Sequence, residues 1–177
     1  MRILMNFVNC TYKHHAQAIL DILNTAIISS TALYDYTPRT LAMMADWFQQ
    51  KDSGNFPVLG ITNNVDELMG FSTYGTFRAW PAYKYSVEHS VYIHMDHRGK
   101  GLGKLLIKQL ITSAHKQQYH TMIGAIDIAN KASVNLHEDM GFTHVGTIPQ
   151  VAYKFERWLD LGFYQLLLDT PEKPVDG

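Results

Sequence analysis

The clearest pattern of apolar and polar residues is that of an amphipathic helix from about Lys13 to Ser30. The apolar positions that share its inner face are Ala16, Ile19, Leu20, Leu23 and Ile27. A second helix follows, which Thr37 or Thr40 can cap, with Pro38 near its first turn. The residues predicted to point inward from it are Leu41, Met44, Trp47 and Phe48.

Two more helices follow later in the chain. One begins at about Leu102, and its apolar positions are Leu102, Leu105, Leu106, Leu110 and Ala114. The other is short and covers Asn130 to Met140. Gly141 follows it, in the position where a glycine commonly ends a helix.

Strand-forming residues dominate most of the remaining chain. The predicted strands are residues 2–9, 57–62, 68–77, 85–93, 121–127, 142–148 and 160–168. Residues 63–66 form a turn, residues 30–38 and 78–85 are irregular, and a long connection, residues 149–159, separates the last two strands. The sequence therefore predicts one α/β domain with a mixed sheet over residues 1–170, followed by a frayed tail over residues 171–177.

Composition excludes several classes of protein. Of 177 residues, 46% are hydrophobic and 18% are charged, as in an ordinary soluble globule. The net charge of −1 suggests neither a nucleic-acid partner nor a membrane surface. The single cysteine, Cys10, excludes an internal disulfide and fits a reducing compartment. Because no apolar run reaches the length of a membrane span and the N-terminus does not resemble a signal peptide, we expect a cytoplasmic protein.

The loop of residues 98–104 is the first candidate site. Its glycines are Gly99, Gly101 and Gly103, and its cations are Arg98, Lys100 and Lys104. Alternate glycines let the backbone turn with its amides uncovered, and the amides at a helix N-terminus attract anions. The loop therefore predicts a ligand that carries phosphates.

The spacing of the loop excludes two common phosphate motifs. A P-loop requires glycine where this chain has Arg98, and serine or threonine where it has Leu105. A dinucleotide fingerprint requires its third glycine one residue beyond Gly103. The pattern that fits is Arg/Gln-x-x-Gly-x-Gly/Ala. In this form the loop resembles the pyrophosphate loop of the GNAT superfamily of acyl-CoA-dependent N-acetyltransferases.

A second motif supports this resemblance. Residues 126–137 read Ile-Asp-Ile-Ala-Asn-Lys-Ala-Ser-Val-Asn-Leu-His and are followed by Gly141-Phe142, in the order that GNAT proteins show. Within that superfamily, Glu-His-Ser-Val-Tyr at residues 88–92 and the segment 146–161 resemble the phosphinothricin N-acetyltransferase family. The resemblance extends from Arg2 to Leu168.

The resemblance implies a mixed, mostly antiparallel sheet flanked by helices, with acetyl-CoA as co-substrate and no metal. It assigns the pyrophosphate to Arg98, Gly99, Lys100, Gly101, Leu102, Gly103 and Lys104. We expect the backbone of Val91, Tyr92 and Ile93 to pair with the pantetheine arm as if it were an added strand, and one N–H to polarise the thioester carbonyl. Asn130 can bind the pantetheine amides. Ser133 either does the same or belongs only to the capping turn.

Two residues are candidates for proton transfer. Glu88 stands on the strand that leads into the loop, among tyrosines that could raise its pKa and suit it as a base. His137 occupies the helix position where many GNAT enzymes have a tyrosine acid, and the phosphinothricin family has histidine there. We expect Glu88 to act as base and His137 as acid, and the reverse assignment remains open.

The acceptor is expected to meet a segment rich in aromatic residues. Arg78 could hold a carboxylate through two hydrogen bonds, with Trp80 and Ser90 as further substrate-binding residues. Lys154 can reach an acidic group, and the resemblance implies a homodimer in which Lys154 serves either its own site or that of its partner. Residues 34–36 could form a lid.

Three histidines suggest a metal site, which we reject. His94 and His97 should point to opposite faces of a strand, and no carboxylate cluster accompanies them or His89.

The sequence predicts an acetyl-CoA-dependent N-acetyltransferase for the α-amine of a small amino-acid-like acceptor, such as phosphinothricin, methionine sulfoximine or methionine sulfone. A protein or peptide N-acetyltransferase is the rival enzyme, and a non-catalytic acyl-CoA-binding regulator is the rival from another class. The arginine-bearing aromatic segment favours a closed site for a small molecule over an open peptide groove.

Overall fold

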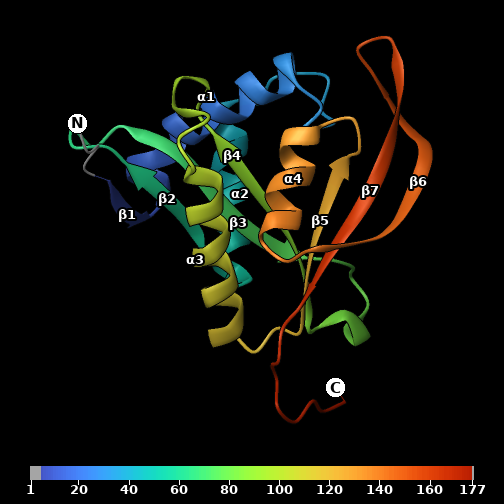
Figure 1. Cartoon of the computed structure of the whole chain (residues 1–177). Helices are drawn as coiled ribbons and strands as arrows, with labels where there is room; N and C mark the ends of the chain where they lie inside the picture. The colour runs from blue at the N-terminus through green and yellow to red at the C-terminus, as the bar shows by residue number, and fades with distance from the viewer. Residues whose placement is uncertain (1–4, 177) are drawn as a thin grey trace. The chain divides into compact units, whose positions relative to one another are not determined.

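The computed structural model describes residues 5–176 (Figure 1). The chain divides into two compact units. The first unit extends to Thr73 and also includes Ser90–Leu110, and the second contains Tyr74–His89 and the chain from Ile111 onward.

Over the described residues, the first unit contains two complete strands, two complete α-helices and one complete 3-10 helix, together with parts of two further strands and of a third α-helix. Its elements are β1 (Asn6–Asn9), α1 (Tyr12–Ser29), α2 (Leu41–Ser53), β2 (Val58–Thr62), most of β3 (Leu68–Thr76), the end of β4 (Ser86–Ile93), the short 3-10 helix η2 (Met95–His97) and the first part of α3 (Leu102–Lys116). Strand β2 lies between β1 and β3 and is antiparallel to both.

Two apolar clusters lie on opposite faces of the strands in this unit. The first joins α1 and α2 to the strands through Ile19, Leu23, Met44, Phe48 and Phe71. The second joins α3 to the strands through Ile61, Met69, Leu102 and Leu106. On β4, Tyr92 packs in the first cluster whereas Val91 and Ile93 pack in the second, as expected for a strand whose successive side chains alternate.

The second unit is built on a different set of strands. Its elements are the remainder of β3, β4 and α3, the 3-10 helix η1 (Pro81–Tyr83), β5 (Thr121–Asp127), α4 (Lys131–Asp139), β6 (Thr143–Lys154) and β7 (Arg157–Leu167). Strand β5 is parallel to β4 over Ser86–Glu88 and antiparallel to β7, which forms a long hairpin with β6 (Figure 1).

Over residues 5–176 the chain forms seven strands in the order β1-β2-β3-β4-β5-β7-β6 and four α-helices. The predicted mixed α/β fold with a mostly antiparallel sheet is confirmed. A single domain over residues 1–170 stays a prediction.

The two N-terminal helices follow the predicted pattern with one exception. All the predicted inner-face residues of α1 are buried. Thr40 caps α2, because its hydroxyl accepts a hydrogen bond from the Met43 amide at 3.4 Å, so that Pro38 precedes the helix. Leu41 does not point inward. It is 43% exposed, since it is the first residue of the helix and lies beyond the edge of the cluster.

The predicted long connection 149–159 is wrong. Strands β6 and β7 continue through it and meet at Phe155-Glu156, where both residues have positive φ, 51° and 58°. Such a two-residue turn matches the twist of a hairpin. The rings of Tyr153 and Trp158, opposite each other in the ladder, lie 5.1 Å apart and support the extension.

Both ends of the chain also differ from expectation. The predicted first strand begins at Asn6, and residues 2–4 lie outside the described range. The C-terminal tail was predicted to be frayed, but Val175 forms two hydrogen bonds with the Tyr85 hydroxyl. The Val175 amide donates to this hydroxyl at 3.1 Å, and the hydroxyl donates to the Val175 carbonyl at 3.3 Å. These bonds tie the tail to the segment predicted to meet the acceptor.

Candidate active site

The loop before α3 turns at two glycines. Gly99 and Gly101 have φ of 74° and 77°, a conformation that residues with a side chain rarely adopt. A Cβ on either glycine would meet no atom within 4 Å, so the conformation and not crowding requires glycine. Gly103 differs from the expectation, because it lies inside the first turn of α3. The amides of that first turn have no partner within the helix and are available to an anion.

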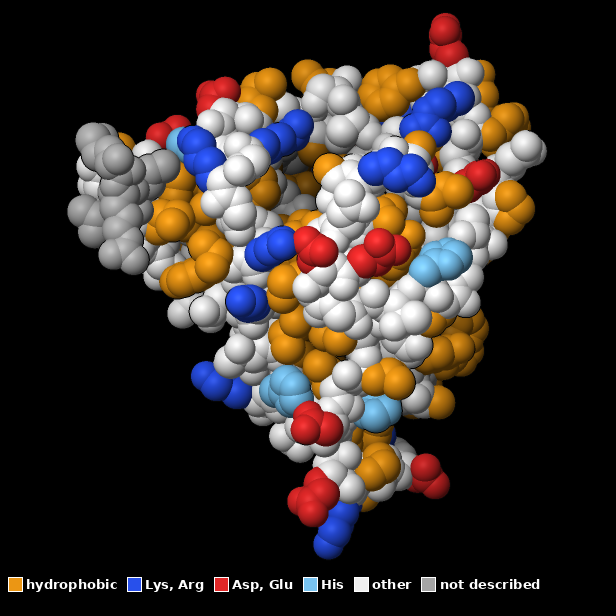
Figure 2. Space-filling view, viewed as in Figure 1, with side chains coloured by type: hydrophobic (Ala, Val, Ile, Leu, Met, Phe, Trp, Pro, Cys, Tyr) orange, Lys and Arg blue, Asp and Glu red, His pale blue; other side chains and the backbone are white. Residues whose placement is uncertain are grey.

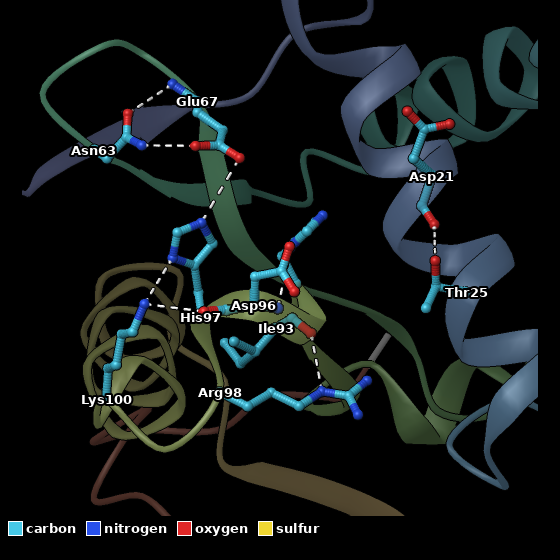
Figure 3. Close-up of polar contacts among 10 residues, drawn as sticks. Asp21, Thr25, Asn63, Glu67, Ile93, Asp96, His97, Arg98 and Lys100 are labelled. Atoms are coloured by element: carbon cyan, nitrogen blue, oxygen red, sulfur yellow. Dashed lines mark hydrogen bonds and ion pairs between the residues drawn. The ribbon is translucent and has the colours of Figure 1, made fainter.

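Lys100, one of the loop's cations, contacts two other residues of the loop region (Figure 3). The Lys100 ammonium donates to the Asp96 carbonyl at 3.0 Å and lies 3.1 Å from Nδ1 of His97. Nε2 of His97 is 3.7 Å from the Glu67 carboxylate, which in turn accepts from the Asn63 amide at 2.8 Å. This chain of contacts connects the loop to the β2–β3 turn.

The other two predicted cations, Arg98 and Lys104, are exposed. The Arg98 Nε donates to the Ile93 carbonyl at 3.4 Å, which folds the side chain back over the end of β4 (Figure 3). Leu102 is buried and serves the core of the first unit.

The predicted orientation of two histidines is wrong. Strand β4 ends at Ile93, so that His94 caps η2 and His97 is its last residue. The centres of their rings lie 5.6 Å apart, and the two side chains do not stand on opposite faces of a strand. Among residues 5–176 there is no group of three or more histidine, cysteine, aspartate or glutamate residues that could hold a metal ion.

Glu88 lies in the second unit, on the part of β4 that pairs with β5. It is half-buried, and burial raises the pKa of its carboxyl group, while the positive charge of Arg78 acts in the opposite direction. The structure therefore brings together the predicted base and the predicted acceptor-binding arginine.

The Arg78 side chain is exposed, and contacts with the preceding residue, Phe77, hold its guanidinium in place. Its guanidinium lies 4.3 Å from the centre of the Phe77 ring and donates to the Phe77 carbonyl at 2.8 Å. The Tyr83 ring meets the same Phe77 ring edge-on at 5.7 Å. Trp80 is 69% exposed, so its ring is accessible to a ligand.

The remaining predicted substrate residues differ in exposure. Ser90, in the first unit, is half-buried. Lys154 is only 5% exposed, and its ammonium lies 5.0 Å from the centre of the Phe155 ring. The charge of Lys154 is therefore held at the turn of the β6–β7 hairpin.

Helix α4 links three predicted residues by hydrogen bonds. Asn130 caps the helix, because its side-chain oxygen accepts from the Ser133 amide at 3.2 Å. The Ser133 carbonyl is 2.7 Å from Nδ1 of His137 one turn later. Ser133 thus belongs to the capping turn, which was one of its two predicted roles.

His137 is 3% exposed and contacts His89, which the sequence indicated only as a metal ligand that we rejected. Its Nε2 lies 3.1 Å from Nε2 of His89, a buried ring on β4. Because His89 and Glu88 are neighbours in a strand, their side chains point to opposite faces, so His137 lies on the face that Glu88 does not occupy. The position of His89 directly after the candidate base was the only signal in the sequence.

Asp127 is a second residue that was not singled out. Its buried carboxylate accepts from the Ala129 amide at 3.0 Å and pairs with the Arg157 guanidinium at 2.7 Å. The Asn130 amide donates to its carbonyl at 2.8 Å. Asp127 therefore fixes both the start of α4 and the base of the hairpin turn.

The fold and the glycine loop agree with one protein family. Residues 18–142 match the model of the acetyltransferase (GNAT) family, and the chain belongs to that family. The predicted enzyme class, an N-acetyltransferase, is confirmed.

Several relatives make the likeness more specific. An L-methionine sulfoximine/L-methionine sulfone acetyltransferase of Pseudomonas aeruginosa is 43% identical over 151 residues, which are 85% of this chain and 88% of the relative. A phosphinothricin N-acetyltransferase of Streptomyces viridochromogenes is 31% identical over 89% of this chain and 85% of the relative. The predicted resemblance to this group of enzymes is confirmed.

Solved structures share the whole fold. A protein of Acinetobacter baylyi, assigned as an acetyltransferase, is 56% identical with a TM-score of 0.98 and covers 99% of this chain and 98% of its own. A Salmonella typhimurium protein with the same assignment, solved with its cofactor acetyl-CoA, is 35% identical with a TM-score of 0.91 over 97% of this chain and 98% of its own.

Proposed function

We propose that this chain transfers the acetyl group of acetyl-CoA to the α-amine of a small amino-acid-like acceptor, by direct attack in a ternary complex. Methionine sulfoximine, methionine sulfone and phosphinothricin are the acceptors that the relatives' activities favour. The observation that carries the proposal is Glu88, a half-buried carboxylate with a raised pKa beside the Arg78 guanidinium.

Acetyl-CoA is proposed to bind the loop and the strand before it. The pyrophosphate would meet the first-turn amides of α3, at the turn formed by Gly99 and Gly101, with Arg98 and Lys104 beside it. The parallel register of β4 with β5 covers Ser86–Glu88 and ends before Val91, which supports pairing of residues 91–93 with the pantetheine arm.

The reaction requires a base, a stabilised oxyanion and a proton for the leaving thiolate. The acceptor ammonium would lose its proton to Glu88, whose raised pKa brings it closer to the working pH. The freed amine would attack the thioester carbonyl, whose developing negative charge would be stabilised by a backbone N–H of residues 91–93. As the C–S bond breaks, the departing thiolate would take the second proton of the attacking nitrogen, so that the amide and free CoA are formed. No metal takes part in this scheme.

The acceptor is proposed to lie along the segment from Arg78 to Trp80. The Arg78 guanidinium would bind its carboxylate and the Trp80 ring would cover its side chain, with Ser90 as a further contact. This segment favours a small acid over a peptide, which would bring no free carboxylate next to its reacting amine.

A two-fold homodimer formed through the β6–β7 hairpin is part of the proposal. Val151, Tyr153, Phe155 and Trp158 are 47%, 47%, 51% and 57% exposed. Figure 2 shows apolar side chains along this hairpin with charged ones among them, a mixture that suits an interface. Lys154 would supply charge at the turn.

The location of the protein in the cytoplasm remains a prediction. No helix among the described residues is long and apolar enough to cross a membrane.

Free CoA released in the presence of a panel of amines tests the proposed function. We expect rapid release with methionine sulfone, methionine sulfoximine and phosphinothricin, and slow release with a peptide of similar size. Faster release with the peptide would support the rival protein N-acetyltransferase. Acetyl-CoA binding without release for any amine would support a regulator.

A further inference from the structure

The two buried histidines of the second unit form one structural feature. The ring planes of His89 on β4 and His137 on α4 are inclined to each other by 29°, the ring centres are 4.9 Å apart, and the two Nε2 atoms lie 3.1 Å from each other. Gly124 of β5 makes room for them, because a Cβ there would lie 3.1 Å from Nε2 of His89 and 3.2 Å from Nε2 of His137. Residues 48 positions apart in the chain are thus packed with little free space.

The hydrogen bonds determine where the protons lie. A carbonyl oxygen can only accept, so the 2.7 Å contact with the Ser133 carbonyl places a proton on Nδ1 of His137. A neutral imidazole then has a lone pair on its other nitrogen, so Nε2 of His137 accepts. The Nε2 of His89 must therefore donate. Its Nδ1, which is buried without a hydrogen-bond partner among the described residues, carries no proton.

The surroundings keep both rings neutral. Burial lowers the pKa of His137, and the hydrogen bond to the Ser133 carbonyl acts in the opposite direction. Burial and the neighbouring His137 lower the pKa of His89 to about 3. The centre of the Phe142 ring lies 5.2 Å from the centre of each histidine ring. The centre of the Tyr164 ring, on β7, lies 6.4 Å from that of His137, and burial raises the pKa of the Tyr164 hydroxyl. Neither side chain supplies a negative charge that would favour a cation near neutral pH.

We propose that His89 is a positioning residue that fixes the tautomer of His137 by donating its Nε2 proton, so that His137 has no proton on Nε2 to give to a leaving thiolate. The pair holds α4, with its capping residue Asn130, against the strand that carries Glu88. The catalytic consequence rests on the proposed acetyl transfer. With this tautomer, His137 would not donate a proton to the thiolate and would instead hold α4 in position.

Nitrogen NMR of the 15N-histidine-labelled protein at neutral pH tests the tautomers without any need for activity. We expect His137 to show the Nδ1–H form and His89 the Nε2–H form, with signals assigned by loss in His137→Gln and His89→Gln. A cationic ring in the pair, or a proton on Nε2 of His137, would overturn the proposal.

Two substitutions of His89 separate the proton from the bulk of the ring. His89→Gln places an amide N–H where the Nε2–H stood, and we expect it to keep kcat within about threefold of wild type. His89→Leu removes the donor and should lower kcat about tenfold, the equivalent of one hydrogen bond. His14→Gln, an exposed histidine on α1, is the matched control.

The combined results distinguish the possible failures. If both His89 variants are folded and lose equal activity, the donated proton has no role. If the wild-type protein shows the expected tautomers but acetylates no amine, the pair stands and the proposed function fails.

Discussion

At the residue scale, two opposing effects determine the pKa of the Glu88 carboxyl group. Burial makes its charged form less favourable, and the nearby Arg78 makes it more favourable. The first effect prevails, so the carboxyl group has a raised pKa, while the positive charge of Arg78 favours its ionised form. That combination suits a group that must accept a proton from an ammonium while an anionic acceptor is bound nearby.

Replacing the base tests this assignment. Glu88→Gln preserves size but cannot accept the proton, so we expect acetyl-CoA affinity to be unchanged and kcat to fall by roughly 10²–10⁴. Stopped assays of CoA release at pH 7 and calorimetry with acetyl-CoA measure the two quantities. A variant that retains more than about half of the wild-type kcat would exclude Glu88 as the base.

Replacing the neighbouring cation should shift the pH profile. In Arg78→Gln the effect of burial is no longer opposed, so the pKa of Glu88 rises further and the acidic limb of kcat/KM moves to higher pH. The KM for a carboxylate-bearing acceptor should also rise, by roughly tenfold for a lost charged hydrogen bond. Lys84→Gln, which removes an exposed cation of the same segment, is the control. If the acidic limb of the kcat/KM profile does not move in Arg78→Gln, Arg78 does not affect the pKa of the base.

At the element scale, the entry to α3 depends on backbone conformation. Gly101 has a φ of 77° and open space around its missing Cβ. Glycine is therefore required here by the conformation of the turn and by the phosphate proposed to lie against it, and not by packing.

A side chain at this turn should affect cofactor binding. We expect Gly101→Val to weaken CoA binding at least tenfold, because a β-branched residue disfavours left-handed backbone by about 1–2 kcal/mol and would crowd a phosphate. Calorimetry measures the affinity. Gly146→Val is the control, since Gly146 has equally open space but no positive φ. Unchanged affinity in a folded Gly101→Val would contradict the phosphate-loop assignment.

The elements that could be predicted are those whose signal is local. Apolar spacing located α1, and the turn residues Asn63–Asp66 located the β2–β3 connection. The glycine pattern located the turn before α3. Each of these depends on a few consecutive residues, so neighbours in sequence were sufficient.

The hairpin and the histidine pair were missed for different reasons. The turn at Phe155-Glu156 lacks the asparagine and glycine that normally announce positive φ, and is stabilised by Tyr153 and Trp158 across the ladder. The contact of His89 with His137 depends on the packing of α4 against β4, which no local pattern records. The candidate acid was therefore located by family likeness, but its partner was not.

At the scale of the whole molecule, the exposed hairpin aromatics bear on assembly. We expect sedimentation at micromolar concentration to show a dimer, and Trp158→Ser to shift it toward monomer, because an interface loses most when a central aromatic is removed. Val145→Ser, at an exposed apolar position nearer the start of β6, is the matched control. If the wild-type protein sediments as a monomer, the proposed dimer is wrong and Lys154 has no role in a partner's site.

The proposed function requires the chain to be a transferase and not merely a binder or a hydrolase of acetyl-CoA. Membership of the GNAT family and the solved relative with acetyl-CoA support that class. In this chain the proposed function depends on Glu88 of β4 as the proposed base and on the glycine turn before α3 as the proposed phosphate site.

The most direct measurement combines wild-type protein, acetyl-CoA labelled with 13C in its acetyl group, and methionine sulfone, with mass spectrometry of the acceptor and a thiol assay of the same samples. We expect N-acetylmethionine sulfone that carries the label, in an amount equal to the CoA released. Release of CoA without labelled acceptor, or binding of acetyl-CoA without either product, would contradict it.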